Sequence, residues 1–161
     1  MNKALFLDRD GVINLERGDY VWKPEDFVLC PNIAQNLNAF QDAGYLLIVI
    51  TNQGGVAKGL YTHEDVKKTL GYMEELLAKE GVRIEKSYYS PYHDSKGKSL
   101  GRKPGSLLFE KAIYEFDVDP KQSIMVGDKE RDVIPSRKFG IKSYLIEKNA
   151  DINFIVRENL P

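Results

Sequence analysis

The chain has 161 residues, 42% of them hydrophobic and 29% charged, and its 24 acidic and 23 basic side chains leave a formal net charge of -1. This length and composition predict one globular domain covering residues 1–161, large enough to bury a substantial core. The balanced charge argues against a protein that tracks extended nucleic acid or binds an anionic membrane, so an anionic ligand would need a local positive pocket.

Two features bear on the compartment in which the chain works. No apolar run approaches the ~20 residues that span a bilayer, and none resembles a signal peptide. Cys30 is the only cysteine, which rules out an internal disulfide and suits a reducing environment. We expect a cytoplasmic, monomeric protein with no membrane partner. Because no base lies near it in the sequence, Cys30 is expected to be a half-buried loop thiol rather than a nucleophile.

Short apolar runs alternate along the chain with amphipathic stretches. In chain order, we expect strands over 4–7, 46–50, 88–89, 123–126 and 143–146, of which the third is the weakest. Helical spacing of apolar side chains falls between them, over 33–40, 62–77, 107–113, from near 131, and over 151–160. Strands without polar alternation, separated by helices, predict an α/β fold: a doubly wound, mainly parallel sheet with helices on both faces. In such sheets, ligands bind beyond the carboxyl ends of the strands.

The second of these helices has recognisable ends. Thr62 can cap its first turn, where Glu64 and Asp65 suit the positive end of the helix dipole. Gly81 follows the last apolar position and can end the helix.

An acidic pair follows the first expected strand, in Asp8-Arg9-Asp10-Gly11. Two carboxylates spaced by two residues leave an extended segment on the same side, and Gly11 permits a sharp turn after them. A structural turn is the default explanation of an isolated Asp-x-Asp. The pair therefore gains weight only in company with other motifs.

Three further polar motifs accompany the acidic pair. The second expected strand leads into Thr51-Asn52-Gln53-Gly54-Gly55, whose hydroxyl and backbone amides suit a phosphate oxygen. Arg102-Lys103-Pro104 places two cations directly before an expected helix. The fourth strand leads into Gly127-Asp128-Lys129, and Asp132 follows one helical turn later. Four such motifs, in this order, are hard to explain as turns.

Carboxylates gathered at one edge of a sheet repel one another and add nothing to stability. A divalent cation removes that repulsion. Hard cations prefer oxygen ligands, and Mg²⁺ typically takes one or two carboxylates together with water and a substrate phosphate. The pattern therefore indicates a divalent cation beside a bound phosphoryl group.

The four motifs together resemble those of the haloacid dehalogenase (HAD) superfamily of phosphatases. Segments 50–59 and 125–129 resemble the branch that contains heptose 1,7-bisphosphate phosphatase and histidinol-phosphate phosphatase, and the heptose enzyme most. The resemblance runs from Ala4 to about Leu145. It implies a Mg²⁺-dependent phosphomonoester hydrolase acting on a small phosphorylated metabolite, with a HAD core and no sizeable cap domain.

The resemblance also implies a role for each matching position. Asp8 is the expected nucleophile that becomes an aspartyl phosphate, and Asp10 the expected general acid and then base. Mg²⁺ is expected on Asp8, Asp128 and Asp10, the last through its backbone carbonyl. Thr51 and Lys103 are expected to bind the transferring phosphoryl group. The positions expected to contact substrate are Asn52, Gln53, Gly54, Arg102, Lys103 and Lys129. Asp132 is expected to orient Lys103 or a metal-bound water.

One departure concerns the zinc loop of the resembled branch, which carries Cys-x-His and then Cys-x-Cys. The corresponding stretches here, 90–93 and 99–102, contain no cysteine, and His93 alone cannot make a four-ligand site. We predict no structural zinc. Because the segments that hold a cap in larger relatives are short, we expect a site open to solvent, with substrate selected by the loops 16–22 and 89–100.

The favoured reaction is removal of the 7-phosphate from D-glycero-D-manno-heptose 1,7-bisphosphate. Histidinol phosphate would suit the same machinery. A polynucleotide 3′-phosphatase shares Thr-Asn-Gln and Arg-Lys-Pro, although the net charge argues against it. Outside the enzymes, a receiver-like phospho-acceptor switch combines carboxylates, Mg²⁺, Thr and Lys on a similar sheet. Receivers carry the phosphorylated Asp after the third strand, whereas the acidic pair here follows the first.

Overall fold

The computed structural model describes residues 1–161 and contains a five-stranded, wholly parallel sheet in the order β3-β2-β1-β4-β5. The strands are β1 (Lys3–Leu7), β2 (Tyr45–Asn52), β3 (Lys86–Ser90), β4 (Ile124–Gly127) and β5 (Lys142–Leu145). All five expected strands are present. The strand order reverses at β1, which places a topological switch point between β1 and β4.

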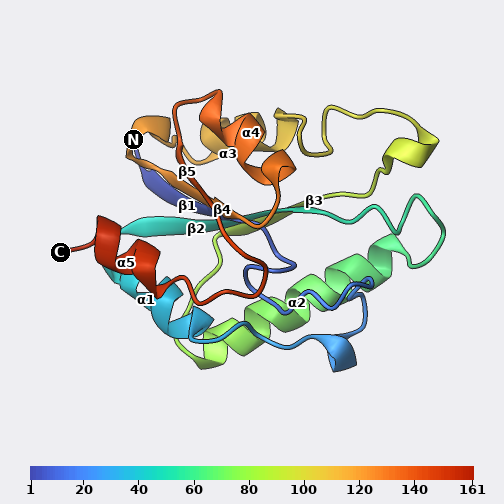
Figure 1. Cartoon of the computed structure of the whole chain (residues 1–161), viewed down its shortest axis with the longest axis horizontal. Coiled ribbons are helices and arrows are strands. Elements are labelled where there is room, and N and C mark those ends of the chain that lie inside the picture. Colours follow the sequence, from blue (N-terminus) through green and yellow to red (C-terminus); the bar gives the residue numbers. More distant parts are fainter.

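Helices cover both faces of this sheet (Figure 1). On one face lie α1 (Ile33–Asp42), α2 (His63–Lys79) and α5 (Asn153–Asn159), and on the other α3 (Leu107–Glu115) and α4 (Glu130–Arg137). The 3₁₀ turns η1 (Pro24–Asp26), η2 (Asp94–Lys96) and η3 (Pro120–Gln122) lie in the connections. The predicted doubly wound α/β fold is confirmed. No helix combines the length and apolar character needed to cross a bilayer.

β1 divides the core in two because its side chains alternate between the faces. Leu5 and Leu7 belong to the larger apolar cluster, under α1, α2 and α5, while Ala4 and Phe6 belong to the smaller one, under α3. All four are fully buried. A strand buried on both faces reads as an unbroken apolar run, which is why the sequence pattern located it.

Parallel pairing brings the carboxyl ends of the central strands to one edge. Leu7 of β1 is level with Val49 of β2 and Val126 of β4. The second motif was expected after its strand, but β2 continues through Asn52 because β3 pairs with it as far as Ser90. Thr51 is therefore a strand residue, fixed by the ladder.

The predicted cap of α2 is confirmed as a complete capping box. The Thr62 hydroxyl accepts from the Asp65 amide at 3.1 Å, and the Asp65 carboxylate accepts from the Thr62 amide at 2.9 Å. Two otherwise unpaired amides at the helix start are thereby satisfied.

Cys30 corrects one expectation. It is buried within the larger apolar cluster, only 3% exposed, and not half-buried. The reason is that its backbone amide donates to the Ile13 carbonyl at 2.8 Å, which draws the segment before α1 under the sheet. Burial raises the pKa of the Cys30 thiol to about 12, so the thiol stays protonated and unreactive.

Candidate active site

Three carboxylates converge at the carboxyl edge of the sheet. Asp8 follows β1 and Asp128 follows β4, and these two strands are paired neighbours. Asp132 reaches the same place from the first turn of α4. One ligand oxygen from each lies within 4.8 Å of the others. The expected acidic cluster therefore forms, with the side chain of Asp132 rather than that of Asp10 as its third member.

The Asp128 side chain is buried without a hydrogen-bond partner. It is 1% exposed, and neither carboxylate oxygen accepts a hydrogen bond; the Lys129 ammonium is 3.7 Å away. Gly11 makes room for it, because a side chain at Gly11 would collide with the Asp128 carboxylate, and the φ of +87° also favours glycine there. A buried carboxylate that accepts no hydrogen bond is costly unless a cation lies close to it, and the Lys129 ammonium is too far away to donate a hydrogen bond.

Burial is also the main influence on acid strength in this cluster. It raises the pKa of Asp8 well above its usual range; the Asp132 charge adds to this effect and the Lys103 charge opposes it. Burial likewise raises the pKa of Asp128. Without a further positive charge, the cluster therefore tends to hold protons.

Lys103 lies between two of these carboxylates. Its ammonium donates to Asp8 at 2.9 Å and to the Ile50 carbonyl at 2.7 Å, and it pairs with Asp132 at 2.6 Å. Burial lowers the pKa of Lys103, but the Asp132 and Asp8 charges outweigh burial, and the net pKa lies above its usual value. All three N–H groups are engaged, so Lys103 must exchange one contact to bind a phosphoryl oxygen.

The oxygen atoms present suit Mg²⁺. Asp8 and Asp128 offer buried carboxylates, and the Asp10 carbonyl accepts no backbone hydrogen bond. Asp132 is committed to Lys103. An all-oxygen set with two carboxylates is the kind of site that Mg²⁺ takes.

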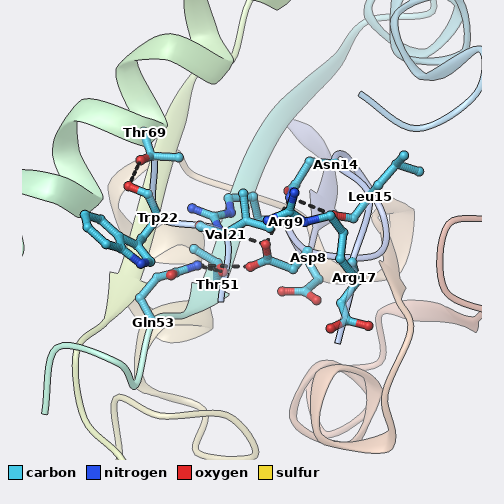
Figure 2. Close-up of polar contacts among 12 residues, drawn as sticks. Asp8, Arg9, Asn14, Leu15, Arg17, Val21, Trp22, Thr51, Gln53 and Thr69 are labelled. Atoms are coloured by element: carbon cyan, nitrogen blue, oxygen red, sulfur yellow. Dashed lines mark hydrogen bonds and ion pairs between the residues drawn. The ribbon is translucent and has the colours of Figure 1, made fainter. Parts of the chain in front are cut away.

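The Asp10 side chain is held apart from the acidic cluster by three donors. Its Oδ1 accepts from Arg9 at 2.7 Å and from Asn14 at 3.0 Å, and its Oδ2 accepts from Gln53 at 3.1 Å. Figure 2 labels these three donors. The same Arg9 nitrogen donates to the Val21 carbonyl at 2.5 Å. These bonds leave the carboxylate fixed at the wall of the cavity.

Asn52 ties the third motif to β2. Its side-chain amide donates to the Lys103 carbonyl at 3.1 Å, and its side-chain carbonyl accepts from the Lys103 amide at 3.0 Å. This reciprocal pair joins residues 51 positions apart and places the Lys103 side chain next to Asp8.

A cavity of about 300 Å³ opens beside these groups. Six of the expected site residues line it, namely Asp8, Asp10, Asn52, Gln53, Lys103 and Lys129. Much of the remaining lining comes from the expected loop 16–22, through Glu16, Gly18, Asp19, Tyr20 and Val21. Helix α4 contributes Arg131 and Asp132. The residues expected at the site but not lining this cavity are Thr51, Gly54, Arg102 and Asp128.

Arg102 was expected to grip the substrate, but its contacts are with the neighbouring loop. Its Nη1 donates to the Tyr92 carbonyl at 3.0 Å, and its Nε lies 3.4 Å from Asp94. A side chain at Gly54 would crowd the guanidinium and His93. Arg102 thus fastens the loop after β3, and no residue of 89–100 lines the cavity.

Sequence reasoning missed Arg9, Asn14, Tyr61 and Arg131. Arg9 and Asn14 stand close to the first motif, yet nothing in their residue types distinguishes them from solvated turn residues. Arg131 reads as an exposed first-turn side chain, and Tyr61 as part of the approach to a helix. Only their positions in space join them to the site.

The chain resembles known proteins over most of its length. A family model described as HAD-hydrolase-like matches residues 100–151. A D-glycero-beta-D-manno-heptose-1,7-bisphosphate 7-phosphatase of Haemophilus ducreyi is 37% identical over 154 residues, covering 92% of this chain and 84% of the relative. A D-glycero-alpha-D-manno-heptose-1,7-bisphosphate 7-phosphatase of Campylobacter jejuni is 43% identical over 131 residues, covering 81% and 74%.

Solved structures give the same picture. D,D-heptose 1.7-bisphosphate phosphatase from B. bronchiseptica, complexed with magnesium and phosphate, superposes with a TM-score of 0.85 at 26% identity. The match covers 99% of this chain and 88% of that one. The corresponding protein from Burkholderia thailandensis gives a TM-score of 0.67 at 25% identity, with the same coverage.

Proposed function

The chain belongs to the heptose bisphosphate phosphatases among the HAD-like hydrolases, and we propose that it removes the 7-phosphate from D-glycero-D-manno-heptose 1,7-bisphosphate with the help of Mg²⁺. The observation that carries the proposal is the buried pair Asp8 and Asp128, which needs a cation and lies beside Lys103. A divalent ion and a phosphoryl group together satisfy all three side chains.

In this proposal the chemistry divides between two aspartates. A carboxylate oxygen of Asp8 bonds to phosphorus while the bond from phosphorus to the sugar oxygen breaks, and Asp10 gives its proton to that oxygen. Asp10 then takes a proton from water as the water oxygen attacks phosphorus. The bond between phosphorus and Asp8 breaks, which releases inorganic phosphate and restores both carboxyl groups.

The remaining residues hold charge in place. Asp8, Asp128 and the Asp10 carbonyl would hold Mg²⁺, whose positive charge would offset that of the acidic cluster and of a bound phosphoryl group. Lys103 brings a second positive charge to the same oxygens, and Asp132 keeps its ammonium directed there. Thr51, near the end of β2, supplies a hydroxyl for the same oxygens in this proposal.

The rim of the cavity favours a bisphosphate over a monophosphate. Arg131 lines the cavity, is half-buried and has no ion-pair partner, whereas the rim acids Glu16 and Asp19 pair with Lys148 and Arg17. Burial, and then the Arg131 charge, lower the pKa of Arg102. Uncompensated positive charge suits a second phosphate better than the cationic end of histidinol phosphate.

We further propose that the chain is a single domain in which the loop after β3 is held without a structural zinc. Arg102 fastens that loop through Tyr92 and Asp94, where relatives of the resembled branch carry thiolates. Metal analysis of the purified protein should therefore find less than about one zinc in ten chains. Stoichiometric zinc would contradict this part of the proposal.

The experiment that tests the function compares kcat/KM, with Mg²⁺ present, over heptose 1,7-bisphosphates, histidinol phosphate and 3′-phosphorylated oligonucleotides. The heptose bisphosphates should be hydrolysed at least about 100-fold better than the others. Release of no phosphate from any of them, with a phosphoryl group retained on Asp8, would favour the receiver-like alternative.

A further inference from the structure

The side-chain amide of Gln53 joins two groups of the proposed machinery. Its Nε2 donates to Asp10 Oδ2 at 3.1 Å and to Thr51 Oγ1 at 3.0 Å, and Figure 2 shows the amide directed toward Thr51. Gln53 is 2% exposed, so water is poorly placed to replace either bond. The Gln53 amide is therefore the side chain that links the acid–base carboxylate to the Thr51 hydroxyl.

Only one orientation of the amide suits its surroundings. If the amide were turned over while Asp10 is ionised, the amide oxygen would face the Asp10 carboxylate, and two acceptors would meet with no proton between them. In the observed orientation, Gln53 Oε1 accepts a hydrogen bond from the Tyr61 hydroxyl at 2.8 Å. Burial raises the pKa of Tyr61 to about 12, so the hydroxyl keeps its proton throughout the neutral range.

The Tyr61 ring is held on several sides. It stacks on Trp22, with ring centroids 6.0 Å apart, and meets the edge of Tyr20 at 5.7 Å. A side chain at Gly55 would collide with the ring, so only glycine fits against it. The Trp22 carbonyl is anchored in turn by the Thr69 hydroxyl of α2 at 2.6 Å (Figure 2). The ring is packed so closely that its hydroxyl is a fixed donor.

We propose that Tyr61 is a positioning residue of the reaction, whose hydroxyl fixes the Gln53 amide and thereby aligns Asp10 with Thr51. This assignment rests on the proposed function, because it concerns the same site. It also links the cavity wall to the chemistry, since Tyr20 lines the cavity and contacts the Tyr61 ring.

The test begins with Tyr61→Phe, which removes one hydroxyl and keeps the stacked ring. With Mg²⁺ and a saturating phosphomonoester, kcat should fall roughly tenfold, the loss of one net hydrogen bond, while KM stays within about twofold. Tyr72→Phe is the matched control. Tyr72 lies on α2 with its ring against Phe27 and its hydroxyl unbonded. The kcat of the Tyr72→Phe variant should therefore equal that of the wild type.

A double variant separates positioning from general loosening of the fold. In a Gln53→Leu background, Tyr61→Phe should cause no further loss of kcat, because the hydroxyl acts only through the amide. Losses that multiply in the double variant would overturn the assignment. An unchanged kcat in Tyr61→Phe would do the same.

A second readout does not depend on turnover. In ¹⁵N NMR spectra of the metal-free protein, the Gln53 side-chain amide pair should shift and exchange faster with solvent in Tyr61→Phe, but not in Tyr72→Phe. An unperturbed Gln53 amide would sink the assignment even if kcat fell. If the wild type hydrolyses no phosphomonoester, the proposed function and this assignment both fail, whereas normal wild-type turnover with a silent Tyr61→Phe removes the assignment alone.

Discussion

Lys103 and Asp132 form a buried pair in which each side chain needs the other. Their side chains are 1% and 2% exposed, and their charged atoms lie 2.6 Å apart. Breaking such a pair from one side costs about 3–5 kcal/mol, because a buried charge is left alone. The pair keeps the Lys103 ammonium charged and directed at Asp8. Burying two charges destabilises the fold, but it places a positive charge where the phosphoryl group is proposed to bind.

Asp8→Asn should lower kcat at least about 10³-fold, because an amide oxygen cannot form the acyl phosphate. The circular dichroism spectrum should remain that of the wild type, since the substitution keeps the size of the side chain. Asp42→Asn, at the exposed end of α1, is the control for the chemical change alone. Residual turnover above roughly a tenth of wild type would remove Asp8 from its role.

Arg131→Gln should discriminate between substrates. Loss of a charge-assisted contact to a second phosphate should lower kcat/KM for the heptose 1,7-bisphosphate about 10- to 100-fold. For the heptose 7-phosphate, which lacks that group, the loss should stay under about threefold. Arg137→Gln, in the exposed last turn of the same helix, is the matched control. Equal losses on both substrates would contradict a second phosphate at Arg131.

At the scale of elements, α2 supports the cavity wall from behind. Its first residue, His63, closely follows Tyr61, and Thr69 further along the helix anchors the Trp22 carbonyl. Its apolar stripe, Val66, Leu70, Met73 and Leu77, packs into the larger core. The helix therefore holds both the segment that ends in Tyr61 and the loop that walls the cavity, and its N-terminus is the part nearest the site.

Thr62→Ala should lower the free energy of unfolding by about 1 kcal/mol, because the capping box is broken at the start of α2. For a chain of this size that corresponds to a fall of roughly 2–4 °C in Tm. Urea denaturation measures the change, and Thr62→Ser should restore most of it. Identical unfolding curves for the Ala and Ser variants would show that the cap contributes no stability.

At the scale of the whole molecule, the sheet concentrates acidic charge where β1 and β4 end. Asp8 and Asp128 both have raised pKa values, with burial as the first cause. In the unfolded chain an aspartate titrates near ~3.9. The folded, metal-free protein therefore binds protons that the unfolded chain has released, and it loses stability as the pH rises from about 4 through the raised pKa values.

Mg²⁺ should therefore raise Tm more at about pH 8 than at about pH 5, since it takes the place of those protons. Thermal unfolding with and without millimolar Mg²⁺ at the two pH values measures the difference. In Asp128→Asn the Mg²⁺-dependent rise should largely vanish. A rise of the same size at both pH values would mean that the ion does not compete with protons at this cluster.

The strands that position the site can be predicted from short stretches of the sequence. A strand buried on both faces must be an unbroken apolar run, and parallel strands must end at one edge. The polar groups that follow β1 and β4 could thus be placed together from the order of residues alone. The pairing Asp8–Asp128 was predictable for this reason. The cap at Thr62 was predictable from the residue types around it, and the place of the loop 16–22 beside the site from the resemblance.

What only the tertiary structure decided are contacts between side chains that no periodicity relates. Whether Arg102 faces the cavity or the loop depends on how the chain after β3 packs, and the structure turns it to Tyr92 and Asp94. Tyr61 reaches Gln53 because its ring fits against a glycine, which no local pattern specifies. Backbone hydrogen bonding repeats along the chain and can be read from it, whereas the packing of individual side chains depends on the shape of everything around them.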